Sequence, residues 1–136
     1  MKIIPVVGRA NSGKTTFIRH LIPALKSYGR VGVIKHLADH DFRLEGEKDT
    51  TVFFESGAEI SAGIDAGKSV IALHTSDLED MLNLFKQQGI DFAVIEGFKT
   101  HPFPKIVIGD LLIETCILRN PSVDDIVSDF SRFEDY

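Results

Sequence analysis

The stretch that decides the fold is Gly8-Arg9-Ala10-Asn11-Ser12-Gly13-Lys14-Thr15. It matches the pattern G-x-x-x-x-G-K-[ST], a P-loop whose backbone N–H groups cradle phosphates. A run of β-formers precedes it at residues 2–7, and apolar residues at helical spacing follow it over residues 14–28. This order predicts a strand, a glycine loop and a helix, with a nucleoside triphosphate bound where the positive helix end and the lysine meet.

The residue types within the loop have separate predicted roles. The glycines let the backbone approach phosphate oxygens without a Cβ clash. Lys14 adds a full charge against the β- and γ-phosphates, and Thr15 offers a hydroxyl to Mg²⁺. The whole predicted nucleotide-binding set is Gly8, Arg9, Ala10, Asn11, Ser12, Gly13, Lys14, Thr15, Thr16 and Lys99.

A second acidic group is expected near the P-loop, to hold Mg²⁺ or to orient water. The predicted strand Asp91–Ile95 ends at Glu96, and α/β sheets place ligand-contacting residues at the carboxyl ends of their strands. We therefore predict that Thr15 and Glu96 bind Mg²⁺, with Asp49 as a further ligand, and that Lys14, Thr15 and Glu96 act in catalysis. Lys99 is expected to pair with Glu96 or with a phosphate. The alternative, a solvated strand-end carboxylate and a surface lysine, stays open.

Further patterns extend the fold. Strands are expected at Val31–Lys35, Ile60–Asp65, Ser69–Leu73, Lys105–Ile108 and Thr115–Leu118. A short helix is expected at Thr50–Ser56, a second after the Ser76 cap up to Gly89, and a third capped by Asn120 with Pro121 first. The fold class is therefore α/β and P-loop NTPase-like, a mostly parallel sheet flanked by helices. A β-hairpin around residues 66–68 extends it, and residues 1–136 are expected to form a single domain.

The segment from His36 to Gly57 is long, polar and rich in charge, which is typical of a functional loop. His36, Asp39, His40 and Asp41 suggest a metal site, but their spacing matches no structural zinc pattern. Contact of Asp41 or Asp49 with Mg²⁺ through water is the better hypothesis. Residues 48–50 are candidates for a switch-like loop, and a merely solvated loop is the alternative.

Composition narrows the class of partner. The net charge is -5 and the sequence pI about 5.5, which argues against nucleic-acid binding. No apolar run approaches the ~20 residues of a membrane span, and the N-terminus lacks the layout of a signal peptide. Cys116 has no second cysteine to pair with, so a cytoplasmic location is expected.

The sequence resembles the MobB family, molybdopterin-guanine dinucleotide biosynthesis protein B, a group of small P-loop GTP-binding proteins. Four segments carry the resemblance: residues 6–16 with Leu21-Ile22-Pro23-Ala24-Leu25, then Val33-Ile34-Lys35-His36, then residues 40–58, and Val94-Ile95-Glu96-Gly97-Phe98-Lys99. The guanine motif Asn-Lys-x-Asp is absent, so a preference for guanine rests on the resemblance alone. Candidate base contacts near the last strand are Arg119, Asn120 and Asp124.

The resemblance implies binding of GTP with Mg²⁺, weak GTPase activity and assistance in molybdenum cofactor biosynthesis. The implied partners are a MobA-like transferase, which attaches guanosine monophosphate to molybdopterin, molybdopterin itself, and a second copy paired through the hairpin. Two alternatives stay open: an adaptor without meaningful catalysis, and a small-molecule kinase. The lack of an obvious water-orienting glutamine favours slow chemistry, and the scattered arginines do not resemble a kinase lid.

Overall fold

The computed structural model describes residues 1–37 and 48–136. The chain forms two compact units, one of Met1–His36 with Glu79–Tyr136 and one of Leu37–Leu78. The expected single domain stays a prediction.

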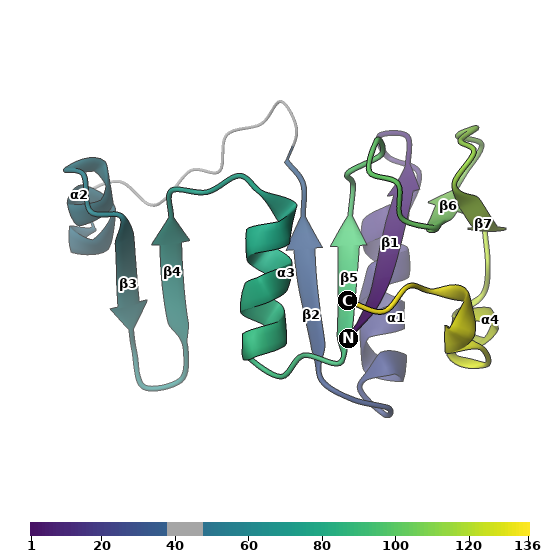
Figure 1. The fold of residues 1–136 in the computed structure, drawn as a ribbon, viewed down its shortest axis with the longest axis horizontal. Helices are drawn as coiled ribbons and strands as arrows, with labels where there is room; N and C mark the ends of the chain where they lie inside the picture. The colour runs from purple at the N-terminus through teal and green to yellow at the C-terminus, as the bar shows by residue number, and fades with distance from the viewer. Residues whose placement is uncertain (38–47) are drawn as a thin grey trace. The chain divides into compact units, whose positions relative to one another are not determined.

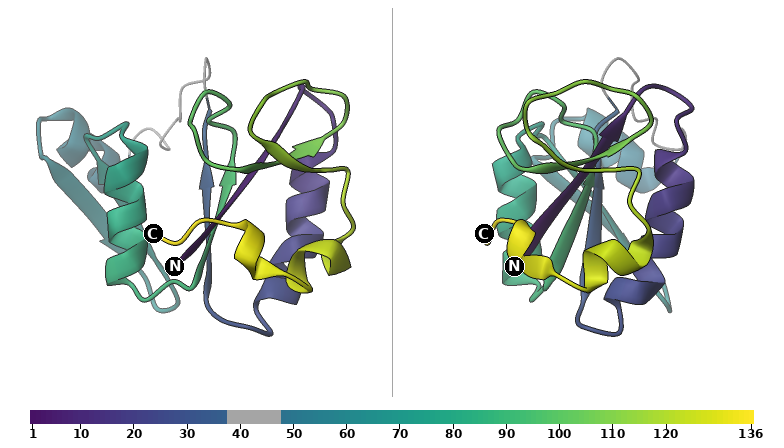
Figure 2. Two further views of the ribbon diagram at one scale, coloured as in Figure 1. Left: turned by 45° about the vertical axis from the view of Figure 1, so that its right-hand side comes forward. Right: turned by 90° about the vertical axis from the view of Figure 1, so that its right-hand side faces the viewer.

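The first unit contains a parallel sheet of five strands in its described residues. The strands are β1 (Lys2–Gly8), β2 (Val31–Lys35), β5 (Phe92–Glu96), β6 (Lys105–Ile108) and β7 (Cys116–Arg119). They lie in the order β2-β5-β1-β6-β7, and every neighbouring pair is parallel (Figure 1). Figure 2 shows α1 (Lys14–Leu25) and α3 (Leu78–Gln87) on opposite faces of this sheet. The prediction of a largely parallel sheet flanked by helices is confirmed.

The core of this unit follows from the apolar spacing of its elements. β1 is buried from Ile3 to Gly8, as expected of a parallel strand with helices on both faces. Ile18, Leu21 and Leu25 recur at helical spacing and form the buried face of α1 against the sheet. Pro23 lies within α1 on its exposed side, and the helix ends at Leu25, three residues before the predicted end.

The second unit contains α2 (Asp49–Glu55) and an antiparallel hairpin of β3 (Ile60–Ile64) and β4 (Ser69–Leu73). The hairpin was predicted, with β3 one residue longer. Asp65 instead belongs to the turn, where its carboxylate accepts hydrogen bonds from the backbone N–H groups of Gly67 and Lys68, at 2.7 and 2.8 Å. These bonds lower the pKa of Asp65. No helix in the described part of the chain combines the length and the apolar character that crossing a bilayer requires.

The predicted Asn120 cap of the last helix is wrong. Helix α4 (Val123–Val127) is capped by Ser122, whose hydroxyl accepts from the Asp125 N–H at 3.2 Å, while the Asp125 carboxylate accepts from the Ser122 N–H at 2.8 Å. Asn120 has φ of 46° and directs its side chain to the backbone of Gly109. The reciprocal Ser-x-x-Asp pair satisfies two helix N–H groups, which explains why the helix begins later.

Removal of the cap tests this assignment. Ser122→Ala should lower the free energy of unfolding by about 1 kcal/mol, because the first turn of α4 loses its acceptor. Ser27→Ala, at an exposed position just after α1, is the control. Equilibrium urea unfolding measures both.

The pH dependence gives a second check on the cap. The bonds to Ser122 hold the pKa of Asp125 below its ordinary 3.8, so their contribution is present above that pH. It is lost as the pH falls through the lowered pKa of the folded protein, so the difference between wild type and Ser122→Ala should narrow. It should not vanish, because the Ser122 hydroxyl still accepts from the Asp125 N–H. A difference that stays constant with pH would contradict the bond from the Ser122 hydroxyl to the Asp125 carboxylate.

Candidate functional site

The residues that follow the parallel strands share one edge of the sheet. Because all five strands point the same way, their carboxyl ends meet along the edge at which the arrowheads lie in Figure 1. The chain continues there into the P-loop after β1, into His36 after β2 and into Gly97 after β5. The segments after β6 and β7 begin with Gly109 and Asn120.

The P-loop itself joins β1 to α1 as predicted. Asn11 and Gly13 have φ of 58° and 92°, in the left-handed region that lets successive N–H groups turn toward one concavity. A Cβ on Gly8 would lie 2.3 Å from the Ile108 carbonyl oxygen and 2.5 Å from Ser12 Oγ. The loop is thus pressed against the end of β6, and only glycine fits where it leaves the sheet.

Polar side chains of the loop fit an anionic ligand. Ser12 Oγ is buried and has no hydrogen-bond partner among the described residues, so a ligand oxygen would satisfy it. Lys14 Nζ donates to the Arg9 carbonyl at 2.6 Å. Arg9 also pairs with Asp110 at 3.0 Å, but both side chains are exposed and the pair contributes little stability.

Glu96 and Thr15 come together beside the loop. The Thr15 hydroxyl lies 3.3 and 3.4 Å from the two Glu96 carboxylate oxygens, at the long end of hydrogen bonding. The Glu96 side chain is only 12% exposed. Oxygen ligands from a hydroxyl and a carboxylate suit Mg²⁺, so this pair fits the predicted ion. Their metal-binding role stays a prediction.

The structure gives Glu96 a partner that the sequence analysis missed. Lys35 Nζ lies 3.5 Å from Glu96 Oε1, whereas the expected partner Lys99 is exposed. Lys35 and Glu96 are the last residues of β2 and β5 and are paired in register. Two predicted strands that both end in a charged residue were the available signal, but the adjacency of β2 and β5 had to be known to use it.

The segment after Glu96 is tightly packed. The rings of His36 and Phe98 stack with centroids 4.2 Å apart and planes 18° from parallel. Gly97 has φ of 104°, and a Cβ on it would lie 2.8 Å from His36 Cβ. The His36 and Gly97 N–H groups donate to the Glu96 and Val6 carbonyls, at 2.9 and 3.1 Å. These contacts fix the backbone around Glu96.

A buried lysine holds the rest of this segment. The Lys105 ammonium donates to the carbonyls of His101 and Phe103 and to the Thr115 hydroxyl. The side chain is fully buried, and this burial lowers its pKa. Lys105 therefore connects the loop before β6 to the segment before β7. The sequence predicted only a strand residue at this position.

The remaining candidates have other positions. Arg119 and Asn120 both bond to the backbone of Gly109, so they shape the end of β6. Asp124 is exposed in the first turn of α4, and its proposed base contact stays a prediction. Asp49 begins α2 in the second unit, and its metal role is likewise a prediction.

The hypothesis of a metal site at His36, Asp39, His40 and Asp41 stays a prediction. Asp39, His40 and Asp41 lie outside the described residues. Within residues 1–37 and 48–136, no three His, Cys, Asp or Glu side chains gather as a metal site.

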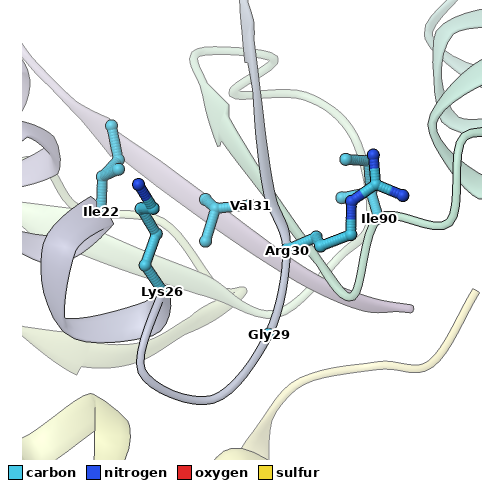
Figure 3. A pocket seen from close by; sticks show the side chains of 6 residues that line it. All are labelled: Ile22, Lys26, Gly29, Arg30, Val31 and Ile90. Atoms are coloured by element: carbon cyan, nitrogen blue, oxygen red, sulfur yellow. The ribbon is translucent and has the colours of Figure 1, made fainter.

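A separate pocket lies away from the P-loop, where α1 ends and β2 and β5 begin. It is a cavity of about 520 Å³ in which apolar side chains are joined by two cationic ones (Figure 3). Its lining residues are Ile22, Lys26, Gly29, Arg30, Val31 and Ile90. Arg30 is engaged through its guanidinium with the Gln88 carbonyl. No residue predicted for the site lines this pocket.

Comparison with known proteins places the chain among its relatives. A sequence model of the family described as molybdopterin guanine dinucleotide synthesis protein B matches residues 3–129. The chain belongs to the MobB family. It is 37% identical to a probable molybdopterin-guanine dinucleotide biosynthesis adapter protein of Bacillus subtilis, over 78% of this chain and 64% of that protein. It is 32% identical to a putative adapter protein of the same pathway in Methanocaldococcus jannaschii, over 100% of this chain and 56% of that protein.

Solved MobB structures share the fold. The crystal structure of Bacillus subtilis MobB aligns with a TM-score of 0.68 and 32% identity, over 81% of this chain and 69% of that chain. The MobB homologue of Bacillus stearothermophilus aligns with a TM-score of 0.58 and 26% identity, over 98% and 73%. The chain spans less than two thirds of the length of the two curated MobB relatives described above.

The close contact at Gly97 gives a test of the site's packing. Gly97→Ala should lower the free energy of unfolding by about 1–3 kcal/mol. The new methyl group would meet the His36 side chain, and alanine would have to adopt the left-handed backbone conformation of Gly97. Gly67→Ala is the matched control, since its φ is not left-handed and the nearest atom to a Cβ there lies 3.8 Å away. Thermal and urea unfolding measure the difference. Equal stability of the two variants would show that the contact around Gly97 is not as tight as described.

Proposed function

We propose that this chain binds GTP with Mg²⁺ at the P-loop, hydrolyses it slowly and assists molybdopterin guanine dinucleotide biosynthesis. The observation that carries the proposal is the P-loop beside the Thr15–Glu96 pair, with the unpartnered Ser12 hydroxyl in the same loop. The names of the relatives support the pathway, since they are described as biosynthesis adapter proteins. Because the chain spans only part of those relatives, the activity of the whole protein is part of this proposal.

The positions of the residues suggest which of them contact the phosphates and which hold Mg²⁺. The N–H groups of residues 9–14 and the N-terminal end of α1 hold the phosphates, and Lys14 adds its charge once its ammonium leaves the Arg9 carbonyl. Thr15 and Glu96 would hold Mg²⁺, which offsets phosphate charge. The proposed preference for guanine over adenine rests on the resemblance to MobB proteins and not on any contact described above.

Slow hydrolysis is consistent with the positions of the glutamines. The sequence contains two, Gln87 and Gln88, at the end of α3. They precede β5 and so lie at the amino ends of the strands, opposite the P-loop (Figure 1). Neither can orient water at the γ-phosphate, as a glutamine does in fast GTPases. This favours an adaptor whose nucleotide state regulates its contact with a MobA-like transferase and molybdopterin.

The central claim is tested at Lys14. Lys14→Ala should weaken GTP binding about 10- to 100-fold, because a charge-assisted contact to the phosphates is lost. Lys26→Ala is the control: it follows the end of α1, roughly 18 Å from the loop for a helix of 12 residues. Isothermal titration calorimetry with GTP and ATP, with Mg²⁺ present, measures affinity and base preference together.

Two outcomes decide the details of this proposal. Unchanged GTP affinity in Lys14→Ala, with the fold intact by circular dichroism, would refute nucleotide binding at the P-loop. Single-turnover hydrolysis of GTP, with and without the transferase, separates a GTPase from an adaptor without meaningful catalysis. Rapid hydrolysis by the isolated protein would rule out the adaptor.

We further propose that the hairpin pairs two copies of the chain. Residues opposite each other in an antiparallel pair share a face, and the register pairs Ile60 with Leu73 and Ala62 with Ile71. Ile60, Ile64 and Ile71 on that face are 62, 82 and 53% exposed. The other face meets α2, where Ser61 Oγ donates to the Thr50 carbonyl at 2.7 Å. An apolar face presented identically by two chains suits a two-fold interface.

A charge on this face tests the dimer. Ile71→Lys should convert the dimer to monomer, because a buried ammonium at a two-fold interface would face its own copy. Val70→Lys adds the same charge on the α2 side of the same strand, at a position 57% exposed, and should leave the dimer intact. Sedimentation velocity measures both variants. A wild-type monomer, or equal behaviour of the two variants, would refute pairing through this face.

A further inference from the structure

Lys35 has been assigned no role in catalysis or in phosphate binding. It ends β2, next to the last residue of β5, so the parallel register itself holds its side chain beside Glu96. The lysine side chain is 52% exposed and the glutamate side chain only 12%. A largely buried carboxylate thus has the ammonium of a half-exposed lysine at 3.5 Å.

The Glu96 carboxylate has two neighbours, Thr15 and Lys35, and only Thr15 could bind a metal ion together with it. Thr15 approaches both its oxygens, and these two residues are the pair proposed above to hold Mg²⁺. Lys35 approaches Oε1 and offers no lone pair, so it cannot be a third ligand. A divalent cation held by Thr15 and Glu96 would be repelled by the ammonium, and the two cations would compete for one carboxylate.

We propose that Lys35 is a counter-cation for Glu96 that competes with Mg²⁺, and so sets how strongly nucleotide binding depends on the metal. The inference rests on the proposed function. Without Mg²⁺, the ammonium offsets the carboxylate charge that would otherwise repel a triphosphate. With Mg²⁺, the metal supplies that charge, and the exposed lysine side chain swings into solvent at small cost.

The quantity to measure is the ratio of two dissociation constants for GTP, one in EDTA and one in Mg²⁺. Lys35→Met should weaken binding in EDTA, because Glu96 then faces the phosphates uncompensated, and should leave or tighten binding in Mg²⁺. The ratio should therefore rise about 3- to 10-fold. Glu96→Gln should lower the ratio, because the carboxylate that both cations share is gone.

Control variants separate this role from a general loss of positive charge. Lys35→Arg keeps the cation and should restore a ratio near that of wild type. Lys26→Met removes a lysine at the far end of α1, roughly 18 Å from the P-loop. This distance is about twice the screening length at physiological salt, so the ratio of dissociation constants should stay unchanged.

A ligand-free measurement makes the pairing testable by itself. Acylation of lysines by an amine-reactive ester, followed by mass spectrometry, reports how exposed and free each ammonium is. In the absence of nucleotide, Lys35 should label faster in Glu96→Gln than in wild type. In wild type, GTP with Mg²⁺ should also raise its labelling.

Each contrary result has a distinct meaning. If Lys35→Met weakens GTP equally in EDTA and in Mg²⁺, Lys35 is a phosphate ligand and the competition is refuted. If Glu96→Gln leaves Lys35 labelling unchanged, the pairing is refuted whatever the nucleotide does. A wild-type protein that binds no GTP would instead overturn the proposed function, and with it the displacement of Lys35 from Glu96 by Mg²⁺.

Discussion

The site depends on the parallel pairing of β1 with β5 on one side and β6 on the other. This pairing brings the P-loop, Glu96 and Gly109 to one edge although they are far apart in the chain. The same pairing buries β1 from Ile3 to Gly8, because both of its faces and both of its edges are covered. The hydrophobic effect therefore stabilises the arrangement that aligns the polar groups.

The parts of the structure that the sequence predicted are those set by local pattern. The P-loop, its helix and the hairpin turn each follow from residues within about a dozen positions of one another. The parallel sheet also followed, because a strand, helix and strand in succession leave few arrangements. The last helix was misplaced even though the deciding Ser122–Asp125 pair is local. Asn120 is an equally good capping residue in sequence, and only its bonds to Gly109 show its other role.

The contacts that could not be predicted depend on which strands become neighbours. Lys35 and Glu96 are separated by 61 positions and meet because β2 and β5 pair in one particular register. Lys105 was predicted only as the first residue of a strand, yet it is fully buried and its ammonium satisfies carbonyls of a loop. Both cases involve charged side chains whose energetics depend on burial, and burial is a property of the assembled fold.

The two loop glycines of the P-loop are required for different reasons. Gly13 has open space around it and is needed for its left-handed backbone, whereas Gly8 is needed because the neighbouring strand leaves no room for a methyl group. The second requirement is independent of any ligand. A descendant that had abandoned nucleotides altogether would still be expected to keep Gly8, while Lys14 would be free to drift. Among relatives with a degenerate P-loop, a residue equivalent to Lys14 therefore indicates nucleotide binding. A glycine equivalent to Gly8 indicates only that the packing of the loop against the sheet is kept.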